Sequence, residues 1–250
     1  MNKCLNCGHE ISGNYCSNCG QKASGERITF KMVLSDFVQA VFLFDSSLYT
    51  TLKGLLTQPG KLIQSFMAGK RKNYLPVFQY FLLFMTIYLI ALKFLGDNIF
   101  SYLNSGFGPD SSTVPDSDTL NKAMMVQVLV RKNLNILYFI LTPILAFFIR
   151  VFFRKARFNY AETLIFSLYV IGTNFLLSTV IVLFCLINVK LYALRILIIF
   201  VYFPFAIIGF TNSKLPAGII KSLLTILSSY LVFITFISVT ILLYVFLIMN

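Results

Sequence analysis

The sequence predicts an all-α integral membrane protein, in which five transmembrane helices follow a small cysteine-rich module and a set of interfacial amphipathic helices. Three observations predict this class. The 250 residues are 58% hydrophobic and 12% charged, with a mean hydropathy of +0.80, whereas a soluble domain carries about twice that share of charge. Five apolar stretches are each long enough to cross a ~30 Å hydrocarbon layer as a helix. Two Cys-x2-Cys pairs lie within the first 20 residues.

The cysteine pairs carry the strongest chemical signal. Residues 4–8 and 16–20 are two Cys-x2-Cys-Gly motifs. Each motif places two thiolates on one tight turn, its glycine permits the positive φ that the turn needs, and four sulfurs complete a tetrahedral Zn²⁺ shell. The predicted ligands of a structural zinc ion are Cys4, Cys7, Cys16 and Cys19. Iron and a redox dithiol are the alternatives. Four sulfurs leave no open position for catalysis, and His9, the only histidine, is expected to be solvated.

A cationic stretch sets the expected orientation in the membrane. Lys70, Arg71 and Lys72 directly precede about twenty almost uncharged residues that end at Leu95. Lys and Arg beside a span stay on the cytoplasmic side. Residues 1–31 lack an apolar core of the kind found in a cleavable signal peptide, and thiolates that bind metal need a reducing compartment. The first 73 residues are therefore expected to be cytoplasmic.

Residues 23–73 are expected to form amphipathic helices on that side. Apolar residues recur at helical spacing over 33–42, over 48–56 and over 62–67, and Pro59-Gly60 is expected to end the second helix. These apolar stripes lie beside the cations Lys53 and Lys61. Two locations therefore fit the helices. The helices either lie in the headgroup layer or pack against the cytoplasmic ends of the spans.

The five predicted spans are residues 74–95, 134–153, 164–187, 191–211 and 222–249. Between the first two spans, residues 96–132 are expected to form an extracytoplasmic loop, with a short helix at 120–130, because 101–119 are rich in Gly, Pro, Ser and Asp. Pro143 is expected to kink the second span.

The distribution of cations agrees with this topology. A second cluster, at the turn after the second span, consists of Arg150, Arg154, Lys155 and Arg157. Cytoplasmic segments then hold 15 of the 21 Lys and Arg, namely nine before Asn73, these four, Lys214 and Lys221. The positive-inside rule therefore predicts a cytoplasmic amino terminus and an extracytoplasmic carboxyl terminus.

Polar residues inside the third span define a candidate site. Its members, which fall within about 40° of one another on a helix, are Ser167, Asn174, Ser178 and Cys185. One interpretation is a polar line in a transport pathway or pocket, and the other, which we favour, is contact between helices through small polar residues. Cys185 is expected to be an inert thiol. Glu162 is expected to stabilise the start of this helix, with coupling to the 150–157 cations as the alternative.

Several motifs resemble a bacterial family of uncharacterised inner-membrane proteins, a domain of unknown function with a zinc ribbon at its front. The resemblance rests on Cys19-Gly20-Gln21-Lys22, on Thr51-Leu52-x-Gly54-Leu55-Leu56-x-x-Pro59-Gly60, on Gly69-Lys70-Arg71-x-x-Tyr74-x-x-Pro76 and, more loosely, on Asn159-Tyr160-Ala161-Glu162. It implies a zinc ribbon on a membrane protein and brings no established activity. In the family a histidine often follows the Glu, but Thr163 stands there in this chain, so any role of that histidine is lost.

These patterns divide the chain into a cytoplasmic zinc ribbon (1–22), interfacial helices (23–73) and a five-span domain of the bacterial cytoplasmic membrane (74–250). The net charge of +12 is clustered beside apolar spans, so membrane lipids are expected partners and nucleic acid is not. A single histidine and the lack of paired carboxylates within the spans argue against an enzyme. The first hypothesis is a subunit or adaptor that docks a protein partner through the ribbon and the amphipathic helices. A small-molecule or ion transport component and a lipid-modifying enzyme are the alternatives.

Overall fold

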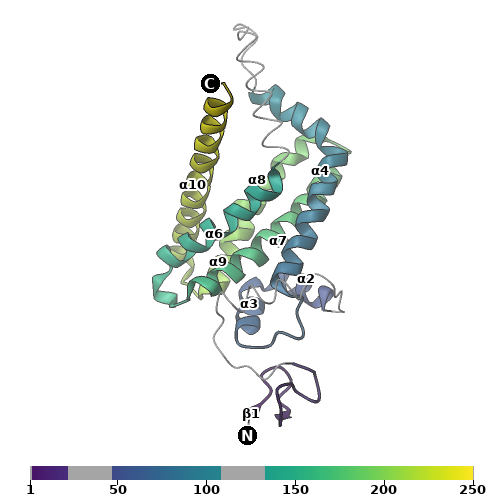
Figure 1. Cartoon of the computed structure of the whole chain (residues 1–250), viewed down its shortest axis with the longest axis vertical. Helices are drawn as coiled ribbons and strands as arrows, with labels where there is room; N and C mark the ends of the chain where they lie inside the picture. The colour runs from purple at the N-terminus through teal and green to yellow at the C-terminus, as the bar shows by residue number, and fades with distance from the viewer. Residues whose placement is uncertain (1, 22–46, 108–132, 250) are drawn as a thin grey trace.

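The computed structural model describes residues 2–21, 47–107 and 133–249. The first of these segments is an antiparallel hairpin of β1 (Asn2–Lys3) and β2 (Glu10–Ile11), in which Lys3 pairs with Glu10. The other two segments are mostly helical and form one elongated bundle, with the hairpin beyond one of its ends (Figure 1). The helical class and the separate cysteine module are thus confirmed.

The helical elements, in chain order, are α2 (Leu48–Thr57), α3 (Pro59–Met67), α4 (Val77–Phe107), α6 (Leu134–Phe152), η2 (Arg154–Ala156), α7 (Tyr160–Phe184), η3 (Val189–Leu194), α8 (Arg195–Leu197), η4 (Ile198–Tyr202), α9 (Phe203–Thr211) and α10 (Leu215–Met249).

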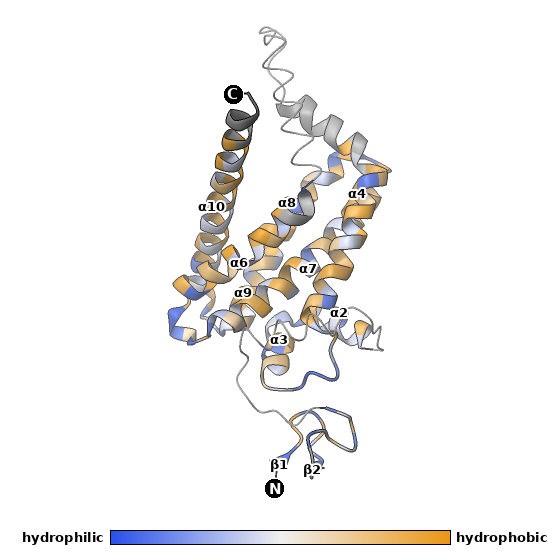
Figure 2. Ribbon diagram, viewed as in Figure 1, coloured by the Kyte–Doolittle hydropathy of each residue, from blue (hydrophilic) through white to orange (hydrophobic). Residues whose placement is uncertain are grey.

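Four stretches of the described chain are long and apolar enough to cross a membrane, as expected of a multi-pass membrane protein. They are Val77–Gly96, Tyr160–Phe184, Val189–Thr211 and Leu215–Ile241. The second predicted span corresponds to α6, whose apolar part, Leu137–Phe152, is shorter than these four. Apolar residues make up most of the length of the helices, and hydrophilic residues are more frequent toward the ends of the bundle (Figure 2).

The predicted loop at 96–132 begins too early. α4 continues through Gly96-Asp97 and ends at Phe107. Gly and Asp each weaken a helix by roughly 0.5–1 kcal/mol, but Ile99 is only 1% exposed, and its burial offsets that cost. The short helix predicted at 120–130 lies outside the described residues.

Two other predicted spans begin earlier than their apolar stretches suggest. α7 begins at Tyr160 because Asn159 and Glu162 form a capping box: the Asn159 side chain accepts from the Glu162 N–H at 2.8 Å, and the Asn159 N–H donates to the Glu162 carboxylate at 2.7 Å. This confirms Glu162 as a helix-start residue.

α10 begins at Leu215, so Lys221 lies inside a helix and not at the edge of the preceding turn.

The fourth predicted span is a continuous helical rod of changing pitch. It begins with the 3₁₀ segment η3, and the π segment η4 ends just before Phe203-Pro204, the first residues of α9. Proline has no N–H, and its ring clashes with the carbonyl four residues earlier, so a wider turn before it relieves the clash.

The amphipathic helices α2 and α3 pack against the end of the bundle. Leu55 of α2 and Ile63 of α3 are fully buried, and the Tyr202 hydroxyl donates to the Leu55 carbonyl at 3.2 Å. Residues 48–67 therefore pack against other helices of the bundle. Pro59 begins α3 and does not simply end α2, as suits a proline at a first helical position. The stripe at 33–42 lies outside the described residues.

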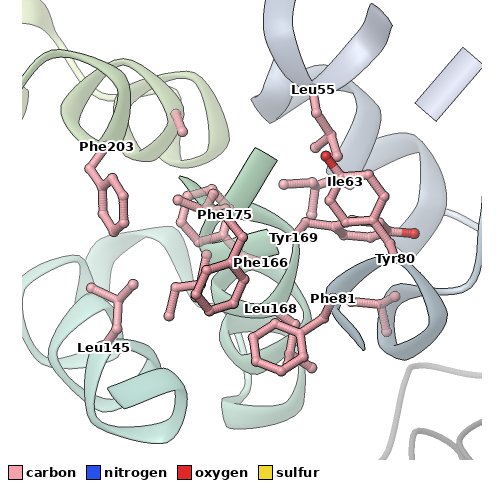
Figure 3. Close-up of a cluster of buried hydrophobic side chains, with 14 of the residues drawn as sticks. Leu55, Ile63, Tyr80, Phe81, Leu145, Phe166, Leu168, Tyr169, Phe175 and Phe203 are labelled. Carbon is pink, nitrogen blue, oxygen red and sulfur yellow. The ribbon is translucent and has the colours of Figure 1, made fainter. Parts of the chain in front are cut away.

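α7 is the central helix, and its residues from Ala161 to Phe175 are all buried. Its aromatic side chains meet Ile63 of α3 and the aromatic side chains of α4 in the core (Figure 3). The Tyr169 ring lies 5.6 Å from both Phe66 and Tyr80, and the Tyr80 hydroxyl lies 3.0 Å from Thr173 Oγ1. The third predicted span is thus the core of the protein, with other helices around it.

Tyr169 also fixes the chain where α4 begins. Its hydroxyl donates to the Leu75 carbonyl at 2.6 Å, and the Leu75 N–H donates to Thr51 Oγ1 at 2.8 Å. We expect Tyr169→Phe to destabilise the protein by about 1–3 kcal/mol, because it leaves a buried carbonyl without its donor. Thermal unfolding in detergent measures this, and Tyr49→Phe is the control because Tyr49 is 71% exposed. Equal unfolding temperatures for the two variants would contradict the assignment.

Candidate metal centre and the loop that it contacts

Two turns of the same shape place the four cysteines. In the first, the Gly8 N–H donates to the Cys4 carbonyl and the Cys4 N–H to the His9 carbonyl, both at 2.8 Å. In the second, the Gly20 N–H donates to the Cys16 carbonyl and the Cys16 N–H to the Gln21 carbonyl, also at 2.8 Å. Gly8 and Gly20 have φ values of +76° and +69°, which explains glycine after each pair.

The two turns face each other and bring the four sulfurs together. The Sγ atoms of Cys4 and Cys19 are 3.5 Å apart, those of Cys7 and Cys16 are 3.6 Å apart, and all four lie within 4.8 Å of one another. A tetrahedron of sulfurs around an ion at about 2.3 Å has edges of ~3.8 Å. The four predicted ligands are thus arranged to hold one metal ion, and His9 is exposed and outside the cluster.

Backbone N–H groups stabilise the thiolate forms of Cys4 and Cys16, and the thiolate is the form that binds a cation. The N–H of Cys7 donates to the sulfur of Cys4 and lowers the pKa of that thiol to about 6, and the N–H of Cys19 lowers the pKa of Cys16 in the same way. The N–H of His9 also lowers the pKa of Cys7, but desolvation and the neighbouring sulfurs outweigh it and raise this pKa to about 11. A divalent ion relieves the repulsion between the sulfurs and displaces the protons that the thiols still carry.

The hairpin contacts the cationic loop that precedes α4. The Gln21 side chain donates to the Gly69 carbonyl and accepts from the N–H groups of Arg71 and Lys72 at 3.3 and 3.4 Å. Asn6 Nδ2 donates to Asn73 Oδ1 at 3.3 Å. This contact was not predicted from the sequence. Its one signal was that Gln21 belongs to the motif Cys19-Gly20-Gln21-Lys22, which resembles the uncharacterised family.

Leu5 fills the space beside Gly69, whose φ is +105°. A Cβ at Gly69 would lie 2.6 Å from Leu5 Cδ1, so the close approach of the hairpin and the backbone conformation both favour glycine.

The remaining predicted site residues lie in two places. Three members of the polar line in α7, Ser167, Asn174 and Ser178, are buried in the core. The Ser167 hydroxyl donates within its own helix to the Thr163 carbonyl at 2.9 Å, and the thiol of Cys185, which is partly exposed, lies 3.9 Å from the Val189 carbonyl. Whether this line is a pathway or a packing surface stays a prediction.

The predicted interface cations gather at one end of the bundle. Arg71 is half-buried, and the exposed members are Lys70, Lys72, Arg150, Arg154, Lys155 and Arg157. The α3–α4 loop and the α6–α7 turn, which carry these cations, both lie at the end nearest the cysteine hairpin (Figure 1).

Comparison with known proteins adds one match. A model of a family described as a protein of unknown function (DUF3667) matches residues 45–89. This segment includes α2, α3, the loop that the hairpin contacts and the first turns of α4. No curated protein and no solved structure matches the chain. The resemblance to an uncharacterised family is thus supported for this segment, and it carries no activity.

The hairpin contact gives a local prediction. We expect Gln21→Ala to leave the metal content unchanged but to speed hydrogen exchange at the Arg71 and Lys72 amides, because those amides lose their side-chain acceptor. Exchange followed by mass spectrometry of this loop measures the effect. Asn18→Ala, at an exposed position of the same hairpin, is the control. Unchanged exchange in Gln21→Ala would mean that the hairpin does not contact the loop in solution.

Proposed function

We propose that this chain is a five-span protein of the bacterial cytoplasmic membrane, with its amino terminus in the cytoplasm and its carboxyl terminus outside. In this proposal α6 is the additional crossing, since its 19 residues give about 28 Å of helix, close to the ~30 Å hydrocarbon layer. The positions of the two termini at opposite ends of the bundle (Figure 1) and the cations at the hairpin end support this orientation.

We infer that the ion held by Cys4, Cys7, Cys16 and Cys19 is Zn²⁺ in a structural role. Four thiolates at tetrahedral spacing suit zinc, and they leave no coordination position for a substrate or a catalytic water. The hairpin has almost no apolar core, so its folding depends on the metal.

We propose that the protein is a subunit or adaptor of a membrane complex and that the hairpin docks the partner. The observation that carries this proposal is a small module whose four cysteines can hold one metal ion. This module contacts the loop that precedes α4 and leaves Tyr15 63% exposed. A closed site has no catalytic use, and an exposed aromatic residue on a rigid module is typical of a protein-binding surface. Membrane lipids are the second expected partner.

Co-purification from native membranes tests this function. The tagged full-length protein is purified in mild detergent, and proteins bound in stoichiometric amounts are identified by mass spectrometry. We expect Tyr15→Ala to reduce the bound partner by at least about tenfold, as for an interface hot spot. Tyr49→Ala, at a similarly exposed tyrosine of α2, is expected to retain it. A partner bound equally by both variants, or no stoichiometric partner, would argue against docking by the hairpin.

The orientation has its own test. Reporter fusions are expected to place residue 2 in the cytoplasm and residue 249 outside. Both termini on the same side would contradict five crossings.

A further inference from the structure

The short helix α2 has two sides that face the chain itself and two exposed sectors. On one side, Leu55 is fully buried against the bundle. On a second side, Gly54 faces α3, because a Cβ at Gly54 would overlap the Leu62 side chain. The two exposed sectors differ in their chemistry, and this difference indicates what α2 contacts outside the chain.

One exposed sector of α2 is apolar. Tyr49 is 71% exposed, Leu56 is 44% exposed and Leu52 is half-buried. At 100° per residue these three side chains fall within about 60° of one another. Gly54 lies about 170° from the centre of the group, so the group is on the side of α2 opposite α3. We call Tyr49, Leu52 and Leu56 the α2 apolar edge.

The other exposed sector of α2 is polar. Its members Thr50, Lys53 and Thr57 are all exposed, and they too fall within about 60° of one another. This sector lies about 170° from Leu55, so it is opposite the side that packs on the bundle. The α2 apolar edge lies between the packed side and the polar sector. A helix at the boundary between hydrocarbon and water shows this order of surfaces.

α2 lies level with the apolar part of the bundle. The Tyr202 hydroxyl, which donates to the Leu55 carbonyl at 3.2 Å, comes nine residues before Thr211, the end of its candidate span. Nine residues of helix rise about 13 Å, and a tilt of about 40° still leaves about 10 Å of depth. The Leu75 N–H, just before the span of α4, donates to Thr51 Oγ1 at 2.8 Å. α2 therefore lies beside parts of the chain that lipid surrounds.

The size and place of α2 fit a helix that lies in the membrane surface. Its ten residues give about 15 Å of helix, half of what a crossing needs. At the hairpin end of the bundle, α3 contacts α9 and α2 contacts α3, below the start of α4 (Figure 1). Tyrosine and lysine are typical of the layer between hydrocarbon and water.

We propose that the α2 apolar edge inserts into the lipid leaflet at the hairpin end of the bundle. Leu52 and Leu56 contact acyl chains, and Tyr49 places its ring among them with its hydroxyl at the headgroups. Lys53, which lies next to Tyr49 on the helix surface, extends to the lipid phosphates. This inference deepens the proposed contact with membrane lipids and does not depend on docking by the cysteine hairpin.

Tryptophan fluorescence tests this proposal. The chain contains no tryptophan, so one introduced tryptophan reports only on its own surroundings. Leu56→Trp lies on the α2 apolar edge, and Thr57→Trp, the matched control, lies at the next residue on the polar sector. Each full-length variant is reconstituted in vesicles of phosphatidylcholine and phosphatidylglycerol without any other protein. Brominated phosphatidylcholine quenches from the acyl chains, and acrylamide quenches from water.

The two quenchers are expected to rank the variants in opposite orders. We expect brominated lipid to quench Leu56→Trp at least about threefold more strongly than Thr57→Trp, because an in-plane helix buries its apolar side about 5–10 Å deep. Acrylamide is expected to quench Thr57→Trp more strongly. Tyr49→Trp replaces one exposed aromatic residue with another and is expected to behave like Leu56→Trp, so it tests the edge even if Leu56→Trp fails to fold.

Two results would overturn the proposal. If acrylamide quenches Tyr49→Trp and Leu56→Trp as strongly as Thr57→Trp, water covers the edge in vesicles, and a protein partner becomes its better occupant. If brominated lipid quenches all three variants equally, α2 has no side that faces water. Neither result bears on docking by the hairpin, which is measured separately through Tyr15→Ala.

Discussion

Replacing Cys4 and Cys7 with serine is expected to abolish metal binding and to unfold residues 2–21 while the bundle stays inserted in the membrane. The double substitution removes two of four ligands, including the buried Cys4. A structural zinc site of this kind contributes roughly 10–16 kcal/mol to folding, far more than a two-stranded hairpin gains from its own contacts. Metal per protein, measured by mass spectrometry, is expected to fall from one zinc to none.

The bundle provides the control for this loss. Cys185→Ser changes a thiol at the end of α7, away from the four-cysteine cluster, and is expected to keep one zinc per chain. In the double variant, hydrogen exchange is expected to become fast in the hairpin and at the Arg71 and Lys72 amides, which lose their contact with Gln21. Stoichiometric zinc in the double variant would overturn the ligand assignment.

The clustering of the four cysteines was predictable because it depends on residues that are close in the sequence. Each Cys-x2-Cys-Gly motif forms its own turn, and the spacing of the two motifs allows a single hairpin to pair them. The contact between Gln21 and the loop at 69–72 was not predictable, because 48 residues separate Gln21 from Gly69. Nothing in a glutamine side chain shows which distant carbonyl it binds.

The ends of the helices were also predicted poorly from the sequence. Hydropathy finds the apolar middle of a span, but α7 begins where Asn159 and Glu162 form a cap, and α4 continues past Gly96-Asp97 because Ile99 is buried. The contacts of Arg195 were not predictable either, because its partners Tyr88 and Tyr138 lie on other helices. The burial of Ile99 and the contacts of Arg195 are tertiary and override local preference, whereas the cap of α7 is a local contact between Asn159 and Glu162.

Gly60→Ala is expected to cause the largest loss of stability of any single substitution considered. Gly60 lies in the first turn of α3, where the helix crosses α9. A Cβ there would overlap the carbonyl group of Gly209 and the nitrogen of Phe210. These are backbone atoms, so no side chain can rotate away, and the Gln64 amide, which donates to the Phe210 carbonyl at 2.6 Å, holds the same contact.

Overpacking in a core costs about 1–3 kcal/mol and more where backbone must move, so we expect at least about 3 kcal/mol, a fall of roughly 6–12 °C in the unfolding temperature. Gly209→Ala is the matched control from the other side of the same crossing. A Cβ at Gly209 meets its nearest atoms, those of Gly60, at an ordinary 3.7 Å, and alanine favours the helix by up to ~1 kcal/mol. Thermal unfolding in detergent should therefore separate two substitutions that look equivalent in sequence. Similar unfolding temperatures for both variants would mean that α3 and α9 do not cross as closely as described.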